Sequence, residues 1–260
     1  MSSSKETIQH TLIVAFLVCL VCSVVVAGAA VALKPMQQKN KDLDRKTNVL
    51  AAAGMLEPGT DVEAAFKQFD VRIVDLETGE FVEGLSPEEV APKVAARNEE
   101  LSHPLSASED PASIKRKPKY AAVYVLTNED GIERLVLPVY GYGLWSTLYG
   151  YMAVSGDLNT VAGIGFYEHA ETPGLGGEVD NPNWKAQWEG KELYNAEGEL
   201  AIRVLKGGVD TSRAGSEHRV SGLSGATLTT KGVDNLVRYW LGPEGFGPLL
   251  ANLKQRGGEV

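Results

Sequence analysis

The chain has 260 residues, of which 43% are hydrophobic and 23% charged, so it is long and apolar enough for one sizeable folded domain and an anchor. Residues 1–46 hold six Lys or Arg and three acidic side chains, and the rest of the chain carries 19 basic and 31 acidic side chains, a net charge of −12. A body that acidic excludes binding to nucleic-acid phosphates.

The first long feature is residues 11–33, which contain no charged side chain and no proline. As a helix this segment is about 34 Å long, enough to cross a hydrocarbon core of about 30 Å. A cleaved signal peptide is the alternative, but its apolar region spans only about 7–15 residues. We therefore expect an N-terminal tail over 1–10, a retained transmembrane helix over 11–33 and contact with a lipid bilayer.

The charges beside this helix and the cysteines within it limit the roles that it can have. More Lys and Arg follow the helix than precede it, which by the positive-inside tendency places the large domain in the cytoplasm. Both cysteines, Cys19 and Cys22, lie within the helix, so the globular domain has neither a disulfide nor a thiolate metal site. Small apolar residues facing lipid or a partner explain this pair better than redox chemistry.

Residues 34–60 predict a helical stalk or linker, because apolar residues recur near helical spacing within 43–55. The folded domain is expected to occupy 61–260. Its first part predicts a strand over 71–76 with a turn over 77–80, a helix over 87–98 capped by Ser86, and a surface loop over 101–118.

The second part of this domain is dominated by predicted strands. They span 120–126, 134–140, 149–155, 160–167 and 200–205, with hairpin turns at 128–131 and 156–159 and a helix over 229–241. Strand pairs joined by short turns, with helices set apart from them, indicate an α+β domain: an antiparallel sheet with flanking helices, preceded by one N-terminal transmembrane helix.

Several site signatures are not met. The glycine pairs at 141–143 and 163–165 lack the third glycine of a dinucleotide fingerprint, and the glycine-rich run at 174–177 is followed by Glu178 instead of the lysine of a P-loop. The four histidines are scattered without metal-ligand spacing. Residues 168–171 contain Glu, His and Glu, yet a structural or ligand-contacting role is favoured there, and no metal is expected.

The segment that points to a function is 221–230, directly before the predicted helix. It holds five Ser or Thr residues among small ones. Helix capping explains one such hydroxyl. Free N–H groups at a helix start also make a seat for a phosphate, and Gly225 and Ala226 allow close approach of the backbone.

Two motifs in the chain resemble those of a known family. Ser224-Gly225-Ala226-Thr227, followed by Leu-Thr-Thr, is similar to the flavinylation motif of FMN-binding subunits in respiratory complexes, where FMN is attached by a phosphodiester to the threonine after the alanine. The Glu-Thr-Pro-Gly-Leu-Gly run at 171–176 resembles a loop of the same proteins. With the single N-terminal span, the whole chain resembles the C subunits of sodium-translocating NADH:quinone reductases.

The resemblance implies a site and assigns residues to it. Thr227 is the expected attachment residue for covalent FMN, with Ser224, Gly225 and Ala226 around the phosphate. The loop contributes Glu171, Thr172, Gly174 and Leu175 beside the flavin ring, with Thr172 offering a hydrogen bond and Leu175 an apolar contact. Trp145 is expected to stack on the ring or else to lie in the core, and Lys206 either stabilises negative charge on reduced flavin or is solvated. Many members carry Asp where this chain has Ser221.

The resemblance further implies an electron carrier that is inactive alone and works within a bacterial inner-membrane complex, relaying electrons from NADH towards quinone with sodium translocation. Its partners are the other subunits and, during maturation, a flavin transferase. Its soluble domain is placed on the periplasmic side, against the charge count. Two alternatives stay open: a G-type subunit of the related ferredoxin:NAD reductase, and a structural or sensory domain without redox chemistry.

Overall fold

The structure, a computed structural model, describes residues 8–129 and 131–258. Residues 1–7 of the expected tail and Asp130 of the first expected hairpin turn lie outside the described residues. The chain divides into two compact units, Met1–Arg45 and Lys46–Val260. The second unit contains the sheet and both motifs singled out in the sequence.

Helix α1 (Ile8–Ala52) is continuous through Pro35. Within the described residues it is the one helix long and apolar enough to cross a membrane. Its side chains over 11–33 are exposed, including Phe16 and Val25, as is usual for a segment covered by lipid. The expected stalk is therefore helical as far as Ala52, in direct continuation of the apolar segment.

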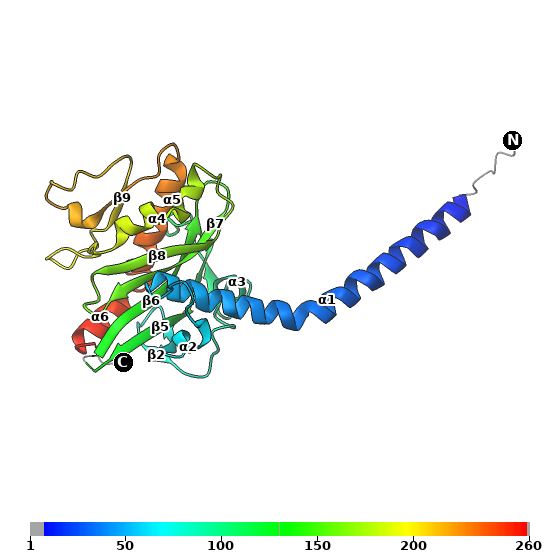
Figure 1. Ribbon diagram of the computed structural model, residues 1–260, viewed down its shortest axis with the longest axis horizontal. Helices are drawn as coiled ribbons and strands as arrows, with labels where there is room; N and C mark the ends of the chain where they lie inside the picture. Colours follow the sequence, from blue (N-terminus) through cyan, green and yellow to red (C-terminus); the bar gives the residue numbers. More distant parts are fainter. Residues whose placement is uncertain (1–7, 130, 259–260) are drawn as a thin grey trace. The chain divides into compact units, whose positions relative to one another are not determined.

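The second unit is built on one antiparallel sheet of six strands in the order β2-β1-β5-β6-β7-β8 (Figure 1). These strands are β1 (Phe69–Asp75), β2 (Phe81–Val82), β5 (Tyr120–Asn128), β6 (Gly131–Tyr142), β7 (Thr147–Ser155) and β8 (Val161–Glu168). Each strand pairs with its neighbours in antiparallel register. The prediction of an antiparallel α+β domain is confirmed, and five of the six predicted strands lie in this sheet.

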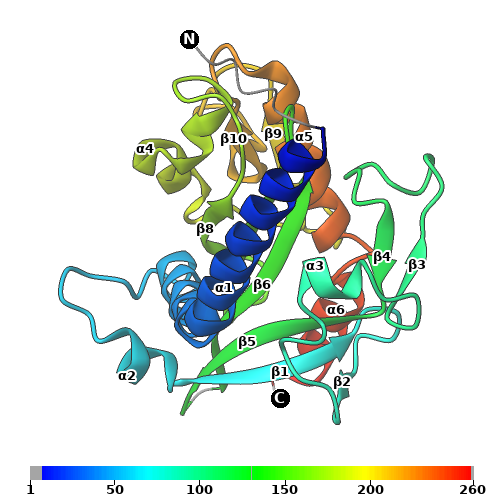
Figure 2. The same ribbon diagram turned by 90° about the vertical axis from the view of Figure 1, so that its right-hand side faces the viewer.

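Both faces of the sheet are buried, which explains why its strands read as nearly continuous apolar runs. Alternate side chains point to opposite faces of a strand. Val123 and Val125 join the core formed with α5 (Thr227–Leu241) and α6 (Gly247–Gln255), two helices that lie behind the sheet in Figure 2. Tyr124 and Leu126 join a second core with the last turns of α1 and with α2 (Val62–Phe66).

Some expected elements are corrected by the structure. Over 87–98 the only helix is α3 (Pro92–Ala95), because Pro92 lacks the backbone N–H that a helix running through it would need and Ala91 before it is extended. Ser86 does cap, since it exchanges hydrogen bonds with Glu89, but around a turn. The expected loop over 101–118 contains a short antiparallel pair, β3 (Ser102–Pro104) and β4 (Arg116–Pro118).

The strand predicted over 200–205 is shorter than expected and lies outside the main sheet. β9 (Arg203–Leu205) pairs in parallel with β10 (Arg219–Ser221), which the sequence analysis missed. The shorter helical elements nearby are η1 (Gly176–Asp180), α4 (Pro182–Lys185), η2 (Ala186–Trp188) and η3 (Ser216–His218). Three residues cannot reveal a strand by periodicity, so this pair was beyond sequence analysis.

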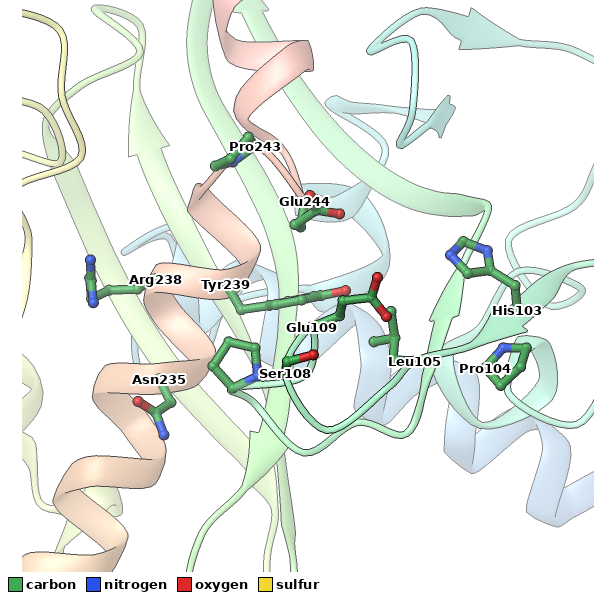
Figure 3. A pocket seen from close by; sticks show the side chains of 11 residues that line it. His103, Pro104, Leu105, Ser108, Glu109, Asn235, Arg238, Tyr239, Pro243 and Glu244 are labelled. Carbon is green, nitrogen blue, oxygen red and sulfur yellow. The ribbon is translucent and has the colours of Figure 1, made fainter.

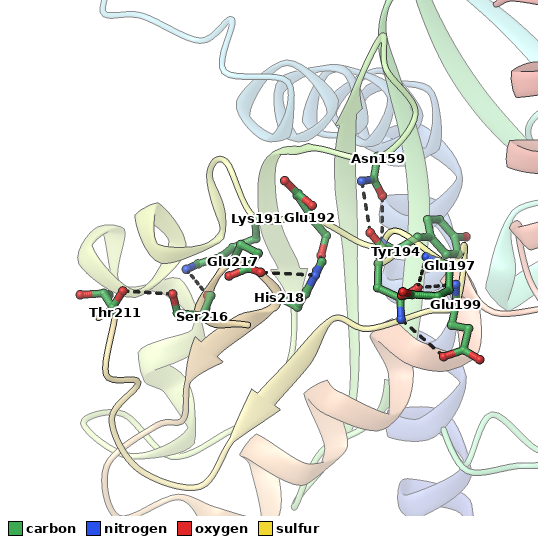
Figure 4. A network of polar contacts seen from close by, with 11 residues as sticks. Asn159, Lys191, Glu192, Tyr194, Glu197, Glu199, Thr211, Ser216, Glu217 and His218 are labelled. Atoms are coloured by element: carbon green, nitrogen blue, oxygen red, sulfur yellow. Dashed lines mark hydrogen bonds and ion pairs between the residues drawn. The ribbon is translucent and has the colours of Figure 1, made fainter. Parts of the chain in front are cut away.

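Polar contacts tie together the lobe formed by residues 176–221, and one of them joins it to the turn between β7 and β8 (Figure 4). Lys191 Nζ donates to the carbonyl of Ser216 at 2.8 Å. His218 Nδ1 donates to the carbonyl of Glu192 at 2.9 Å. The Asn159 side chain accepts from the backbone N–H of Tyr194 at 2.8 Å. The chain leaves β10 at a fixed place and enters α5 six residues later.

Candidate functional site

Three segments far apart in the sequence meet at the start of α5: the helix start itself, the loop after β8, and the turn between β6 and β7. A Cβ on Gly225 would lie 3.0 Å from Leu175 Cδ2, so the first two segments touch. A Cβ on Gly232 would lie 2.5 Å from the carbonyl oxygen of Tyr142, so α5 packs directly on the end of β6. Both motifs singled out in the sequence are therefore parts of one site.

The start of α5 is not capped by a side chain. Its N-cap residue is Ala226, and Thr227 is the first helical residue. Within the described chain, the backbone N–H groups of Thr227, Leu228 and Thr229 donate to no residue, whereas the N–H of Thr230 closes the first helical turn at 2.9 Å. Unpaired N–H groups at the positive end of the helix dipole form an anion-binding site, called the anion seat from here on.

The hydroxyl groups of this segment divide between two environments. Thr230 Oγ1 accepts from the N–H of Leu223 at 3.0 Å, and Thr229 Oγ1 is buried in a hydrogen bond with Glu171. Ser224 and Thr227 are exposed, and their hydroxyls make no hydrogen bond with a described residue. The two buried hydroxyls fix the loop, which leaves Thr227 as an accessible hydroxyl at the anion seat.

The loop after β8 presents a tight turn to this seat. The N–H of Leu175 donates to the carbonyl of Thr172 at 3.1 Å, and Gly174 has φ +74°, which is the left-handed region that favours glycine. Pro173 before it completes the pattern of a type II turn. Thr172, Gly174 and Leu175 are exposed, so the tip of the turn faces outward beside Gly225.

Glu171 joins all three segments. Its side chain is buried, with 5% of the residue exposed. Oε1 accepts from the backbone N–H groups of Leu144 and Trp145, each at 3.0 Å, and Oε2 accepts from Thr229 Oγ1 at 2.6 Å. The carboxylate thus points into the protein. The first residue of the 171–176 motif therefore has a structural role, which is to join the three segments.

The ionisation of Glu171 follows from these bonds. Burial alone would raise the pKa of the carboxyl, because it disfavours the charged form. The hydrogen bonds from Thr229 and from the backbone of Trp145 and Leu144 outweigh burial and hold the pKa below its usual range. The buried group is a carboxylate near neutral pH and keeps all three donors engaged.

His169 is fixed in one tautomer next to Glu171. Its Nδ1 accepts from the backbone N–H of Glu171 at 3.2 Å, and its Nε2 lies 2.8 Å from Asp180 Oδ2. A neutral imidazole that accepts at Nδ1 carries its proton at Nε2 and donates it to Asp180. Both ring nitrogens are therefore used in shaping the loop.

Exposed apolar side chains lie on the segments that meet at the start of α5. Trp145 is 63% exposed, so the alternative of a core tryptophan is wrong. The sequence analysis did not assign three further residues there, namely Tyr142, Leu144 and Leu228, which are also exposed. The sequence did contain a signal for these residues, because the turn at 142–145 is apolar, whereas hairpin turns are usually polar. Solvent-facing aromatic and aliphatic groups of this kind mark a binding surface.

Lys206 and Ser221 lie at the edge of the site. Lys206 is exposed directly after β9, and the next residue, Gly207, accepts at its carbonyl from the N–H of Gly222 at 2.9 Å. Ser221 Oγ accepts from the N–H of Val209 at 3.0 Å, and its carbonyl accepts from Trp184 Nε1 at 2.9 Å. Ser221 therefore holds the segment after Lys206 against the start of the motif.

Comparisons with known proteins agree with this geometry. Residues 143–242 match the FMN-binding domain family. The chain is 54% identical to the C subunit of the Na(+)-translocating NADH-quinone reductase of Pseudomonas aeruginosa over 257 residues, which cover 97% of this chain and 98% of that protein. It is 44% identical to the C subunit of the same enzyme in Vibrio alginolyticus over 261 residues, 100% of both chains.

Two solved structures share the fold. The crystal structure of NqrC from Shewanella oneidensis superposes with a TM-score of 0.74 at 35% identity, covering 84% of this chain and 99% of that one. The crystal structure of the Na(+)-translocating NADH-quinone reductase C subunit from Parabacteroides distasonis superposes with a TM-score of 0.64 at 27% identity, covering 84% of this chain and 96% of that one. The likeness thus extends over nearly the whole of both crystallised chains.

Proposed function

This chain belongs to the family of Na(+)-translocating NADH-quinone reductase C subunits, and on that premise we propose that FMN is joined to Thr227 by a phosphodiester bond. The observation that carries the proposal is an exposed threonine hydroxyl at a helix start whose first N–H groups have no partner in the described chain. The linkage joins Thr227 Oγ1 to the flavin phosphate with net loss of water. A flavin transferase acts on the exposed segment during maturation.

The subunit is part of an oxidoreductase complex and serves in it as an FMN electron carrier. Bound FMN supplies the redox chemistry, and the protein supplies attachment, orientation and electrostatics. We infer that the relay runs from NADH towards quinone and is coupled to sodium translocation. The part of the chain that the structure describes has one helix long and apolar enough to cross a membrane, and the sequence has no dinucleotide fingerprint, so the subunit depends on its neighbours to deliver and remove electrons.

The chain's own residues divide the work of holding the flavin. The unpaired N–H groups at the start of α5 hold the phosphate, with Ser224 and the backbone of Gly225 and Ala226 beside it. Thr172, Gly174 and Leu175 form one side of the ring site, and Trp145 stacks on or edges the ring. Glu171 acts from inside by fixing the loop to the helix, and Lys206 stabilises negative charge on the reduced flavin.

The site is open, and this openness supports covalent attachment. Ser224, Thr227, Leu175 and Trp145 are all exposed. Noncovalent ligands usually sit in concave sites that bury most of their surface. A covalent bond retains the flavin on an open surface, where it exchanges electrons with partners.

A domain without redox chemistry, in which the Ser/Thr cluster only caps a helix, requires a hydroxyl at the N-cap. The N-cap is Ala226, with no side-chain hydrogen bond to the helix start. The relatives described above are named as C subunits, which also disfavours the G-type alternative.

We further propose that α1 crosses a bacterial inner membrane once and that the second unit lies on the periplasmic side. The Lys and Arg that follow the apolar segment favour the opposite side. The charge bias of one helix is a weak constraint when neighbouring subunits hold the topology. Reactivity of a cysteine introduced at exposed Glu99 towards a membrane-impermeant thiol reagent in intact cells tests this placement. Labelling only after lysis would contradict it.

The deciding experiment is the intact mass of the full chain made together with a flavin transferase. One phosphodiester-linked FMN adds about 440 Da, its free mass less a water. The band should also fluoresce in a denaturing gel. Thr227→Ala should remove both signals, whereas Ser224→Ala, the other exposed hydroxyl of the motif, should keep them. A Thr227→Ala protein that still carries the added mass would refute the assignment.

A further inference from the structure

A hollow of about 600 Å³ lies along the C-terminal half of α5, apart from the site at its start. One wall is α5 with Asn235 and Tyr239, and the other is the segment after β3 with Leu105 and Glu109; Glu244 closes one end (Figure 3). Tyr239 is twelve residues beyond Thr227, or about 18 Å along the helix axis. A ligand in this hollow leaves the start of α5 free.

The hollow contains a buried polar atom without a partner. Tyr239 is 4% exposed, and its hydroxyl oxygen makes no hydrogen bond with any described residue. Figure 3 shows this hydroxyl turned towards the side of the hollow where Leu105 and Glu109 lie. Leaving a buried hydroxyl unpaired is unfavourable, and buried polar groups are rarely left so. The unpaired phenol therefore points to a bound group.

The carboxylates beside this hydroxyl have acceptor capacity to spare. Glu109 Oε2 accepts from the N–H of Ser106 at 3.1 Å and from its Oγ at 2.6 Å, while Oε1 accepts from no described residue. Glu244 Oε2 pairs with Lys117 Nζ at 2.7 Å, and its Oε1 likewise accepts from no described residue. Each of the two carboxylates thus keeps one oxygen free to accept a hydrogen bond.

The positive group on the same stretch of helix does not point towards these two oxygens. Arg238 leaves α5 in the direction opposite to Tyr239, away from Glu109 and Glu244 (Figure 3). His103, Ser108 and Asn235 also line the hollow, and on the side to which the phenol points it offers the Tyr239 hydroxyl and two carboxylate oxygens. Together these groups suit a cationic group that carries several N–H donors.

We propose that this hollow binds a lysine or arginine side chain of a neighbouring subunit in the complex. Its N–H groups donate to Glu109 Oε1 and Glu244 Oε1 and to the phenol oxygen of Tyr239. The wall at Leu105 packs on the aliphatic stem of the guest, as such stems pack on apolar surface elsewhere. A protein neighbour is the occupant because the chain is a subunit of a complex and is acidic outside its first 46 residues.

This proposal does not depend on the flavin. It assigns to the C-terminal half of α5 a contact that holds the subunit in place, at a distance from the start of the same helix. Failure of the Thr227 assignment would leave it untouched, and the reverse also holds.

The test uses the complex purified from membranes, with the photoreactive residue benzoylphenylalanine placed at Ser108, an exposed residue of the hollow. Illumination should join this position to one other subunit, at a peptide that contains lysine or arginine. The same residue placed at Glu197, exposed in the lobe of Figure 4, is the position control. Combining the Ser108 probe with Glu109→Lys or with Tyr239→Phe should lower the crosslink yield about tenfold, because each variant removes a hydrogen bond to the charged guest.

Folding of the variants is checked by the thermal midpoint of the full chain in detergent. Glu109→Lys loses only two exposed hydrogen bonds with Ser106, and Tyr239→Phe removes only an unpaired hydroxyl, so both midpoints should stay close to that of the parent chain. Glu109→Gln is a milder second variant and should lower the yield as well. The proposal is overturned by a probe at Ser108 that reacts only with water or lipid, by a crosslinked peptide without a basic residue, or by yields unchanged in the folded variants.

Discussion

Thr229 Oγ1 donates a 2.6 Å hydrogen bond to Glu171 Oε2, which joins two residues 58 positions apart in the sequence. The contact fixes the start of α5 to the loop after β8. Gly176 is needed beside it, because a Cβ there would lie 2.6 Å from both atoms of the bond. The spacing between the attachment threonine and the loop at 172–175 is thus set by a buried, charge-assisted hydrogen bond.

We expect Glu171→Gln to lower the free energy of unfolding by about 1.5–3 kcal/mol, because an amide has one oxygen for three donors and brings donors of its own. Thr229→Val should cost a similar amount by leaving Oε2 unpaired. The double variant should cost clearly less than the sum, since the two residues share one bond. Urea unfolding of the full chain in detergent measures all three. Glu99→Gln, at an exposed position, is the matched control, and additive costs would refute the coupling.

The same carboxylate predicts a pH dependence. Hydrogen bonds hold the folded-state pKa of Glu171 below its ordinary value of 4.5, so the unfolded chain binds this proton more readily. The stability contributed by Glu171 is then complete above about pH 4.5 and is lost as the pH falls through the lowered folded-state pKa. The difference in unfolding free energy between the parent chain and Glu171→Gln should shrink over that range. A difference that stays constant from pH 7 to pH 3.5 would contradict the assignment.

The strands of the main sheet were predictable because their side chains are apolar over lengths that periodicity can detect. The runs at 120–126 and 149–155 lie within β5 and β7. The helix expected over 87–98 failed because Ser86 and Glu89 carry the cap pattern, yet Pro92 interrupts the backbone that would follow it. Local signals of this kind define a turn as well as they define a helix.

The two motifs of the candidate site were predictable from the sequence, but their contact with each other was not. The sequence identified Thr227 and the loop from Glu171, and it assigned the carboxylate to the ring. The structure turns that carboxylate inward to the N–H groups of Leu144 and Trp145. Pairings between segments that far apart depend on how strands and helix pack, which no local pattern encodes.

Gly225→Ala should reduce flavin attachment more than backbone strain alone explains. Gly225 has φ +73°, where a side chain costs about 1–2 kcal/mol, and its new Cβ would also lie 3.0 Å from Leu175 Cδ2. Gly190→Ala is a matched control, because Gly190 has φ +74° with open space around it. The readouts are the unfolding free energy and the fraction of chain with the added flavin mass. Equal flavin loading in both variants would contradict the contact.

Leu175→Glu should change the absorbance and the reduction potential of the flavin while leaving the attachment at Thr227 intact. Leu175 is 44% exposed, so the substitution costs little stability, but it places a negative charge beside the ring and disfavours the reduced, anionic form. The potential should therefore fall. Val94→Glu, at an exposed apolar residue outside the proposed ring site, is the charge control. An unchanged spectrum and potential in folded, loaded Leu175→Glu protein would place the ring elsewhere.

The last prediction concerns the assembled complex. If the flavin on this subunit is a required carrier, Thr227→Ala should stop electron flow to quinone, because no other exposed hydroxyl of the motif stands at the first position of α5. Oxidation of NADH with an artificial acceptor upstream should continue, and Thr227→Ser, which keeps a hydroxyl at the same place, should retain part of the quinone activity. The isolated, loaded subunit should accept electrons from dithionite yet show negligible NADH:quinone turnover.

The purified complexes must contain their subunits in equal amounts, so that loss of assembly is not mistaken for loss of electron transfer. Normal quinone reduction by a fully assembled Thr227→Ala complex would show that the flavin here lies off the path, and the proposed carrier role would fail.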